Sequence, residues 1–180
     1  MQHVAAKPPR SYPWFVRLLF WKQRRIFGRM LDSSLLWARS PWVFAAFALL
    51  YGALERRSSP LSPVLRSLVM VRVSQINRCA FCVDINTATL AERGVSEEKV
   101  SSLAEWRRTD LFAPDERLAL EYAEATSLNK VDDDLRLRLK ERWGDDTIVE
   151  LTGLIAFQNL SAKFNSALDV PAQGFCRLPL

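Results

Sequence analysis

Two cysteines, Cys79 and Cys82, stand three residues apart in the stretch NRCAFCVDIN (77–86). Two thiols at this spacing can form a redox pair, supply half of a zinc site, or pack as small apolar side chains in a core. A four-ligand zinc site needs further partners, and the only histidine is His3 and the only other cysteine is Cys176. We therefore expect no metal and no cofactor. The spacing alone leaves the redox and the packing interpretations open.

The local sequence predicts that both cysteines lie at the start of a helix. Asn77 is a good N-cap residue, and Gly94 is a typical residue after a helix end. Side chains three residues apart share one helix face, so the two sulfurs can meet. Cys79 then lies in the first turn, where the backbone N–H groups and the nearby Arg78 favour a thiolate.

The rest of the chain has the pattern of an all-α protein, without a convincing strand or a glycine-rich phosphate loop. Ser-Pro pairs and acidic first turns mark several helix starts. We expect helices over 14–31, 41–55, 63–76, from Ser96, within 113–126 and 131–143, and over 145–168, followed by a loop-like tail. Polar residues in the last, most apolar helix, Gln158, Asn159 and Asn165, are expected to be hydrogen-bonded when buried.

Residues 14–31 form a basic amphipathic segment. Its apolar positions gather on one side of a helical wheel and its arginines on the other. We expect the apolar side to pack within the protein or against a neighbouring subunit rather than to lie on a membrane surface. The longest apolar run, 42–54, is shorter than the ~20 residues that a membrane-spanning helix needs.

The net charge of +5 comes from the N-terminal third, because residues 55–180 hold 17 basic and 19 acidic side chains. This distribution does not predict nucleic-acid binding. Without an apolar signal segment at the start, the default expectation is a cytoplasmic, reducing compartment. In that setting a close cysteine pair is more often catalytic, redox-active or metal-binding than a structural disulfide.

The stretch LSPVLRSLVMVRVSQINRCAFCVDINTATLAERGVSEEKVSSL (61–103) resembles the carboxymuconolactone decarboxylase superfamily, and within it the alkylhydroperoxidase D-like branch. The shared layout is a helix leading into C-x-x-C, a helix ending in Gly, and a Ser-Glu-Glu helix start, matched over about 61–110. FQNLSAKFNSALDVP (157–171) resembles the closing helix of the family. The resemblance weakens before residue 40, so we expect one domain (1–180) with a basic extension (1–40).

The resemblance implies an all-α fold that assembles into dimers, trimers or hexamers. It also implies reduction of hydroperoxides by the cysteine pair, with Cys82 as the peroxidatic thiol and Cys79 as the resolving thiol. A separate thiol system would reduce the disulfide. The family activates its peroxidatic thiol with a Glu twelve residues before the first cysteine and a His four residues after the second. Here those positions hold Ser67 and Asn86.

The two departures define the functional hypotheses. Asn86 cannot take a proton as histidine does, and Ser67 cannot act as a carboxylate base. Loss of a general base commonly costs about 10²–10⁴-fold in rate, but cysteine depends least on a base. We therefore expect a thiol-dependent peroxidase or thiol–disulfide oxidoreductase with an altered relay. The alternative is a non-catalytic oligomeric module for binding or redox sensing.

Overall fold

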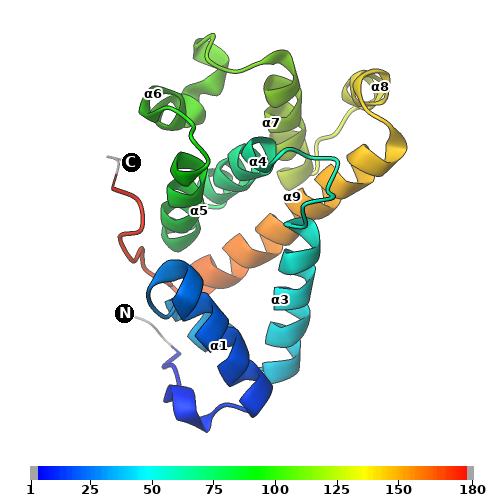
Figure 1. The fold of residues 1–180 in the computed structure, drawn as a ribbon. Coiled ribbons are helices and arrows are strands. Elements are labelled where there is room, and N and C mark those ends of the chain that lie inside the picture. Colours follow the sequence, from blue (N-terminus) through cyan, green and yellow to red (C-terminus); the bar gives the residue numbers. More distant parts are fainter. Residues whose placement is uncertain (1–3, 178–180) are drawn as a thin grey trace.

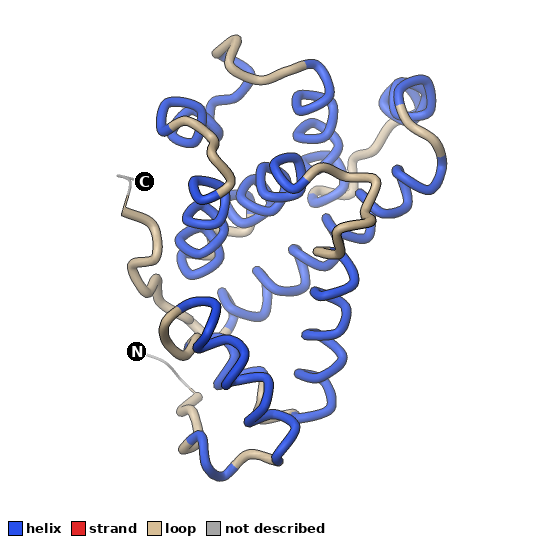
Figure 2. Tube along the Cα trace, in the orientation of Figure 1, coloured by secondary structure: helices blue, strands red, loops and turns tan. Residues whose placement is uncertain are grey.

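The computed structural model describes residues 4–177, and every regular element in that range is a helix (Figures 1 and 2). The expected all-α class is confirmed. The order is η1 (Pro9–Ser11), α1 (Trp14–Phe27), α2 (Asp32–Trp37), α3 (Pro41–Leu54), α4 (Pro63–Ile76), α5 (Ala80–Glu92), α6 (Glu97–Ser101), η2 (Ser102–Arg108), α7 (Pro114–Ser127), α8 (Asp133–Arg142) and α9 (Asp145–Ala167).

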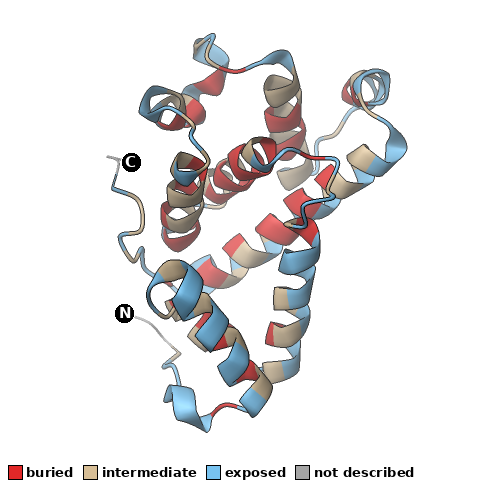
Figure 3. Ribbon diagram, in the orientation of Figure 1, coloured by how far each residue is buried: buried red, intermediate tan, exposed pale blue. Residues whose placement is uncertain are grey.

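Helix α4 lies at the centre and packs against α5, α7 and α9 (Figure 1). Its apolar residues occur on all sides of the helix, which is the pattern of a fully enclosed helix. Val69 and Val73 are completely buried and face α7 and α9, whereas Leu68 and Val71 belong to a second cluster with Leu90 of α5. Figure 3 shows most of this central helix in the colour of buried residues. Burial of each large aliphatic side chain contributes about 1.5–3 kcal/mol.

Local capping signals set several helix starts as the sequence indicates. The side chains of Ser62, Ser96 and Asp132 each accept a hydrogen bond from a backbone N–H of the first turn that follows. Gly94 follows α5 with φ of +81°, a conformation that favours glycine. These bonds satisfy amide groups that have no partner within their own helix.

The expected role of Asn77 as the N-cap of α5 is wrong. Asn77 is the C-cap of α4, and its side chain donates to the carbonyl of Val73 at 2.8 Å and to Oδ1 of Asn159 at 2.9 Å. Arg78 then turns the chain with φ of +51°. Helix α5 starts at Ala80, and Cys79 is its N-cap. An asparagine side chain suits both helix ends, and contact with α9 decides which end it takes.

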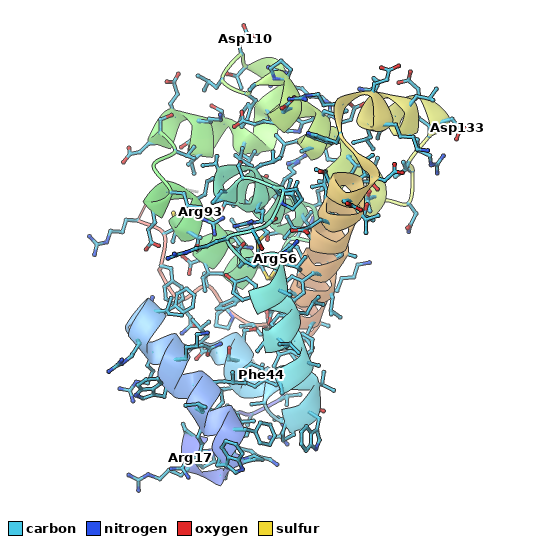
Figure 4. All side chains as sticks on the ribbon, turned by 45° about the vertical axis from the view of Figure 1, so that its right-hand side comes forward. Arg17, Phe44, Arg56, Arg93, Asp110 and Asp133 are labelled. Carbon is cyan, nitrogen blue, oxygen red and sulfur yellow. A yellow bond between two sulfur atoms is a disulfide. The ribbon has the colours of Figure 1, made fainter. Side chains whose placement is uncertain are left out.

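The N-terminal segment also differs from its expected form. One helix was expected over 14–31, but α1 ends at Phe27 because Gly28 adopts φ of +73°, and a separate short helix, α2, follows. Only part of the expected apolar side is buried: Val16 and Phe20 pack with Phe44 of α3. Figure 4 shows Phe44 beside α1 and Arg17 pointing outward. Among the described helices, none is long and apolar enough to cross a membrane.

Glu124 of α7 connects three elements. Its carboxylate accepts hydrogen bonds from Nε of Arg72 on α4 at 2.7 Å and from Nε1 of Trp106 on η2 at 2.8 Å. Arg107 forms a third contact. Burial acts to raise the pKa of Glu124, but the bonds from Trp106 and Arg107 and the charge of Arg72 outweigh it, and the pKa lies below its ordinary value.

We predict that Glu124→Gln lowers the free energy of unfolding by about 1–3 kcal/mol at pH 7. A carboxyl group with a lowered pKa in the folded state stabilises the fold above its unfolded pKa. The difference between variant and wild type should therefore be complete above pH ~4.5 and shrink as the pH falls further. Urea unfolding across pH measures it. Glu105→Gln is the matched control, because that carboxylate is 67% exposed. An equal loss in both variants would contradict the prediction.

Candidate functional site

Cys79 and Cys82 are joined as a disulfide at the start of α5, with their Cα atoms 5.2 Å apart. The predicted proximity of the two sulfurs is confirmed. Both residues are only 2% exposed. The backbone N–H of Cys82 donates to Sγ of Cys79 at 3.2 Å, so the sulfur of Cys79 takes the place of an N-cap oxygen. This position at the positive helix end favours a thiolate on Cys79 once the disulfide is reduced.

The sulfur of Cys82 has a different partner, the side chain of Asn165 on α9. Nδ2 of Asn165 donates to Sγ of Cys82 at 3.3 Å, and its Oδ1 accepts from the hydroxyl of Ser33 on α2 at 2.6 Å. Asn165 is completely buried. The sequence predicted a hydrogen-bonded core amide here but not its contact with the cysteine. No local signal could identify that contact, because the two residues lie 83 positions apart.

A cavity of about 320 Å³ lies beside Cys82, between α1, α3, α5 and α9. Among the described residues that line it, Cys82 is present and Cys79 is not. Most of the wall is apolar, and four phenylalanine rings contribute to it: Phe27, Phe47, Phe81 and Phe157. A molecule in this cavity would therefore meet Cys82 before Cys79.

The two positions that replace the family's relay serve other contacts. Asn86 lines the cavity, but its Nδ2 donates to Oγ of Ser74 at 3.1 Å. Oγ of Ser67 accepts from Nη1 of Arg93 at 2.8 Å. Neither residue has a hydrogen bond to a cysteine sulfur among the described contacts. Both side chains therefore connect helices around the pair.

The charged side chains near the cysteine pair contribute less to a thiolate than the sequence suggests. Arg78 is exposed, and His3 lies outside the described residues. In the part of the chain that the structure describes, no group of three or more His, Cys, Asp or Glu side chains could hold a metal ion. The carboxylate of Asp84 accepts the backbone N–H groups of Gln173 and Cys176 at 2.7 Å each. The tail is thereby attached to α5.

Comparison with known proteins places this site in a family. The profile of the carboxymuconolactone decarboxylase family matches residues 41–125. The uncharacterized protein YnjA of Escherichia coli K12 is 49% identical over 175 residues, which cover 96% of each chain. The chain belongs to the carboxymuconolactone decarboxylase family. The resemblance seen in the sequence of the cysteine region is confirmed.

Several solved structures share the fold of this chain. The AhpD-core, peroxidase-related protein of Ralstonia eutropha JMP134 superposes with a TM-score of 0.86 at 21% identity, covering 96% of this chain and 93% of that one. The debrominase Bmp8 superposes with a TM-score of 0.85 at 19% identity, covering 97% and 94%. A variant of Bmp8 was solved in complex with 2,3,4-tribromopyrrole. At these identities the likeness establishes the fold.

We predict that Asn165→Ala raises the pKa of the Cys82 thiol in the reduced protein by about one unit. The lost hydrogen bond stabilises the thiolate by roughly 1–1.5 kcal/mol, and one pKa unit corresponds to about 1.4 kcal/mol. Asn165→Asp should raise the pKa further, because a carboxylate repels the thiolate. The pH dependence of alkylation at Cys82, followed by mass spectrometry, measures the pKa.

Asn159→Ala is the matched control for this experiment. Asn159 is an amide on the same helix that bonds Ser127 and Asn77 and has no recorded hydrogen bond to either cysteine. An unchanged pKa of Cys82 in both Asn165 variants would show that the amide does not stabilise the thiolate.

Proposed function

We propose that the protein is a thiol-dependent peroxidase in which Cys82 reacts with the peroxide and Cys79 resolves the product. The observation that carries this proposal is the asymmetric placement of the pair. Cys82 borders a ring-lined cavity, and Cys79 does not. The disulfide between them is the product that such a reaction leaves.

The proposed chemistry proceeds in three balanced steps. The thiolate of Cys82 attacks the terminal oxygen of a hydroperoxide, which carries the hydrogen. The O–O bond breaks, and Cys82 becomes a sulfenic acid. The leaving alkoxide takes a proton from solvent to become an alcohol. The thiol of Cys79 then attacks the sulfenic acid on Cys82, and the disulfide forms with release of water. Two thiols of an external reductant return both cysteines to the reduced state by exchange.

Two features substitute for the missing relay in this proposal. The helix N-terminus favours a thiolate on Cys79, and Asn165 donates to Sγ of Cys82. Neither group accepts a proton, so deprotonation depends on solvent. A cysteine of ordinary pKa is a few per cent thiolate at neutral pH, which is sufficient for a slow reaction. We therefore expect a rate below that of relatives that have the complete relay.

A second candidate is a non-catalytic module for binding or redox sensing. The observation that favours it is that Ser67 and Asn86, at the relay positions, bond Arg93 and Ser74 instead of approaching the sulfurs. A sensing module would form the same disulfide without repeated turnover. The rate of turnover with an excess of reductant therefore separates the two functions.

The reduced protein should form one Cys79–Cys82 disulfide for each equivalent of an organic hydroperoxide. With dithiothreitol present, the wild type should consume peroxide repeatedly, and Cys82→Ser should lose at least 100-fold of that rate. Cys176→Ser is the control, because Cys176 lies outside the disulfide. Formation of the disulfide without turnover would favour redox sensing. Absence of the disulfide would exclude both the peroxidase and redox sensing, and would leave the binding module.

2,3,4-Tribromopyrrole belongs in the same experiment as a second oxidant, since a debrominase of this fold binds it and the cavity here is lined by rings. Reduction of a C–Br bond by the pair would give the disulfide, bromide and a C–H bond formed with a solvent proton. Bromide release faster than peroxide consumption would favour this substrate class over hydroperoxides.

We propose that the chain forms a homo-oligomer through the outer faces of α1 and α3. Helix α3 has no charged residue, yet Trp42 and Leu49 on it are 78% and 76% exposed. On α1, Trp14 is 75% exposed, and Phe15 beside it stacks on Trp42. Figure 3 shows α1 and α3 mainly in the colours of exposed and intermediate residues. A helix that is apolar on all sides is usually enclosed, and a second copy would enclose this one.

Light scattering should therefore give a mass that is a multiple of 20.6 kDa. Leu49→Glu should shift the mass toward the monomer, because it places a charge in the proposed contact. Leu137→Glu is the control, since Leu137 of α8 is similarly exposed at 62% but far from this surface in sequence and structure. A monomeric wild type would contradict the proposal.

A further inference from the structure

The cavity beside Cys82 is larger than a small peroxide requires. Helix α3 contributes two small residues one turn apart, Ala48 and Gly52, and a Cβ added at Gly52 would meet no atom within 4 Å. A water molecule occupies about 30 Å³ in the liquid, and hydrogen peroxide is of similar size, whereas this space measures about 320 Å³. The space is therefore about ten times larger than a small peroxide, and most of its wall is apolar.

Several polar side chains in the cavity wall already have partners. Ser33 is bonded to Asn165, and Asn86 and Gln158 both donate to Ser74. These groups stabilise the contacts between α2, α4, α5 and α9. The lining residues also include the exposed Lys22 and two residues whose buried oxygen atoms have no partner among the described residues.

Two buried oxygen atoms of the lining residues have no hydrogen-bond partner among the described residues, Oε1 of Gln23 and Oε1 of Glu55. The amide of Gln23 can present either its oxygen or its nitrogen after a rotation. An ionised carboxylate can only accept. The free oxygen of Glu55 can therefore be satisfied only by a hydrogen-bond donor.

The second oxygen of Glu55 holds the carboxylate in place. Oε2 accepts from Nη2 of Arg93 at 2.6 Å, and Nη2 of Arg66 lies 3.5 Å from it. Arg93 also donates to Ser67, at the position where the sequence resemblance implies a relay glutamate. Glu55, the C-cap of α3, is thus connected through Arg93 to Ser67 on α4. Its unpartnered oxygen is fixed because its other oxygen is bonded.

We propose that Glu55 is a ligand-positioning residue that accepts the O–H or N–H of an apolar, ring-sized molecule in this cavity. This inference rests on the proposed function for its substrate: the O–H of an organic hydroperoxide is the donor, and its apolar body lies against the phenylalanine rings. A buried acceptor without a partner is unfavourable, and the ligand's donor removes that cost. Glu55 selects the ligand and takes no part in the bond changes at sulfur.

The direct test compares two unreactive ligands, cumyl alcohol and cumyl methyl ether, which share the ring but differ in the O–H donor. Titration calorimetry with the wild type should show the alcohol binding about tenfold more tightly, as one hydrogen bond to a charged group allows. In Glu55→Ala the two ligands should bind about equally. Glu150→Ala should keep the preference, since Glu150 pairs with Arg56 and does not line the cavity.

Equal binding of both ligands by the wild type, or no binding of either, would overturn the inference. A preference that survives in Glu55→Ala would also overturn it, provided that circular dichroism shows a folded variant. The wild-type comparison needs no variant, so misfolding of Glu55→Ala leaves the inference testable. Because neither ligand reacts, this result is independent of turnover: peroxidase activity can fail while the alcohol preference holds, and the reverse.

Discussion

The side chain of Asn165 connects three helices at the point where the cysteines lie. It is completely buried, it accepts from Ser33 of α2, and it donates to Cys82 of α5. A buried amide with both ends bonded fixes the distance between the helices that carry its partners. The cavity wall depends on that distance, because α2, α5 and α9 all contribute residues to it. The surroundings of Cys82 and the packing of α2 therefore both depend on Asn165.

The polar residues around the cysteine pair form a hydrogen-bond network centred on Ser74. Oγ of Ser74 accepts from the amides of Asn86 and Gln158 and donates to the carbonyl of Met70 at 2.6 Å. This arrangement makes use of Asn86, since an amide can donate to a hydroxyl oxygen without changing protonation state. Asn86 stands where the sequence resemblance implies a relay histidine, and its amide stabilises the contact between α4 and α5.

The sequence predicts the features that depend on neighbours in the chain. Ser62, Ser96 and Asp132 cap their helices because a cap needs only the next turn. The sequence predicts the wrong helix for Asn77, because the position of its side chain depends on Asn159, which lies 82 positions away. Helix α2 was missed because it has six residues and no side-chain cap bond. The contact of Asn165 with Cys82 and the ion pairs of Glu55 likewise join distant segments, so the tertiary structure was needed to find them.

The central claim is that the sulfur beside the cavity reacts first. It is tested most directly by trapping the sulfenic acid with dimedone in the two single variants, Cys79→Ser and Cys82→Ser, after exposure to one equivalent of cumene hydroperoxide. The account predicts a dimedone adduct on Cys82 in Cys79→Ser and at least tenfold less adduct on Cys79 in Cys82→Ser. An adduct that forms mainly on Cys79 would contradict the assignment and would favour the helix N-terminus over the cavity as the feature that selects the reactive thiol.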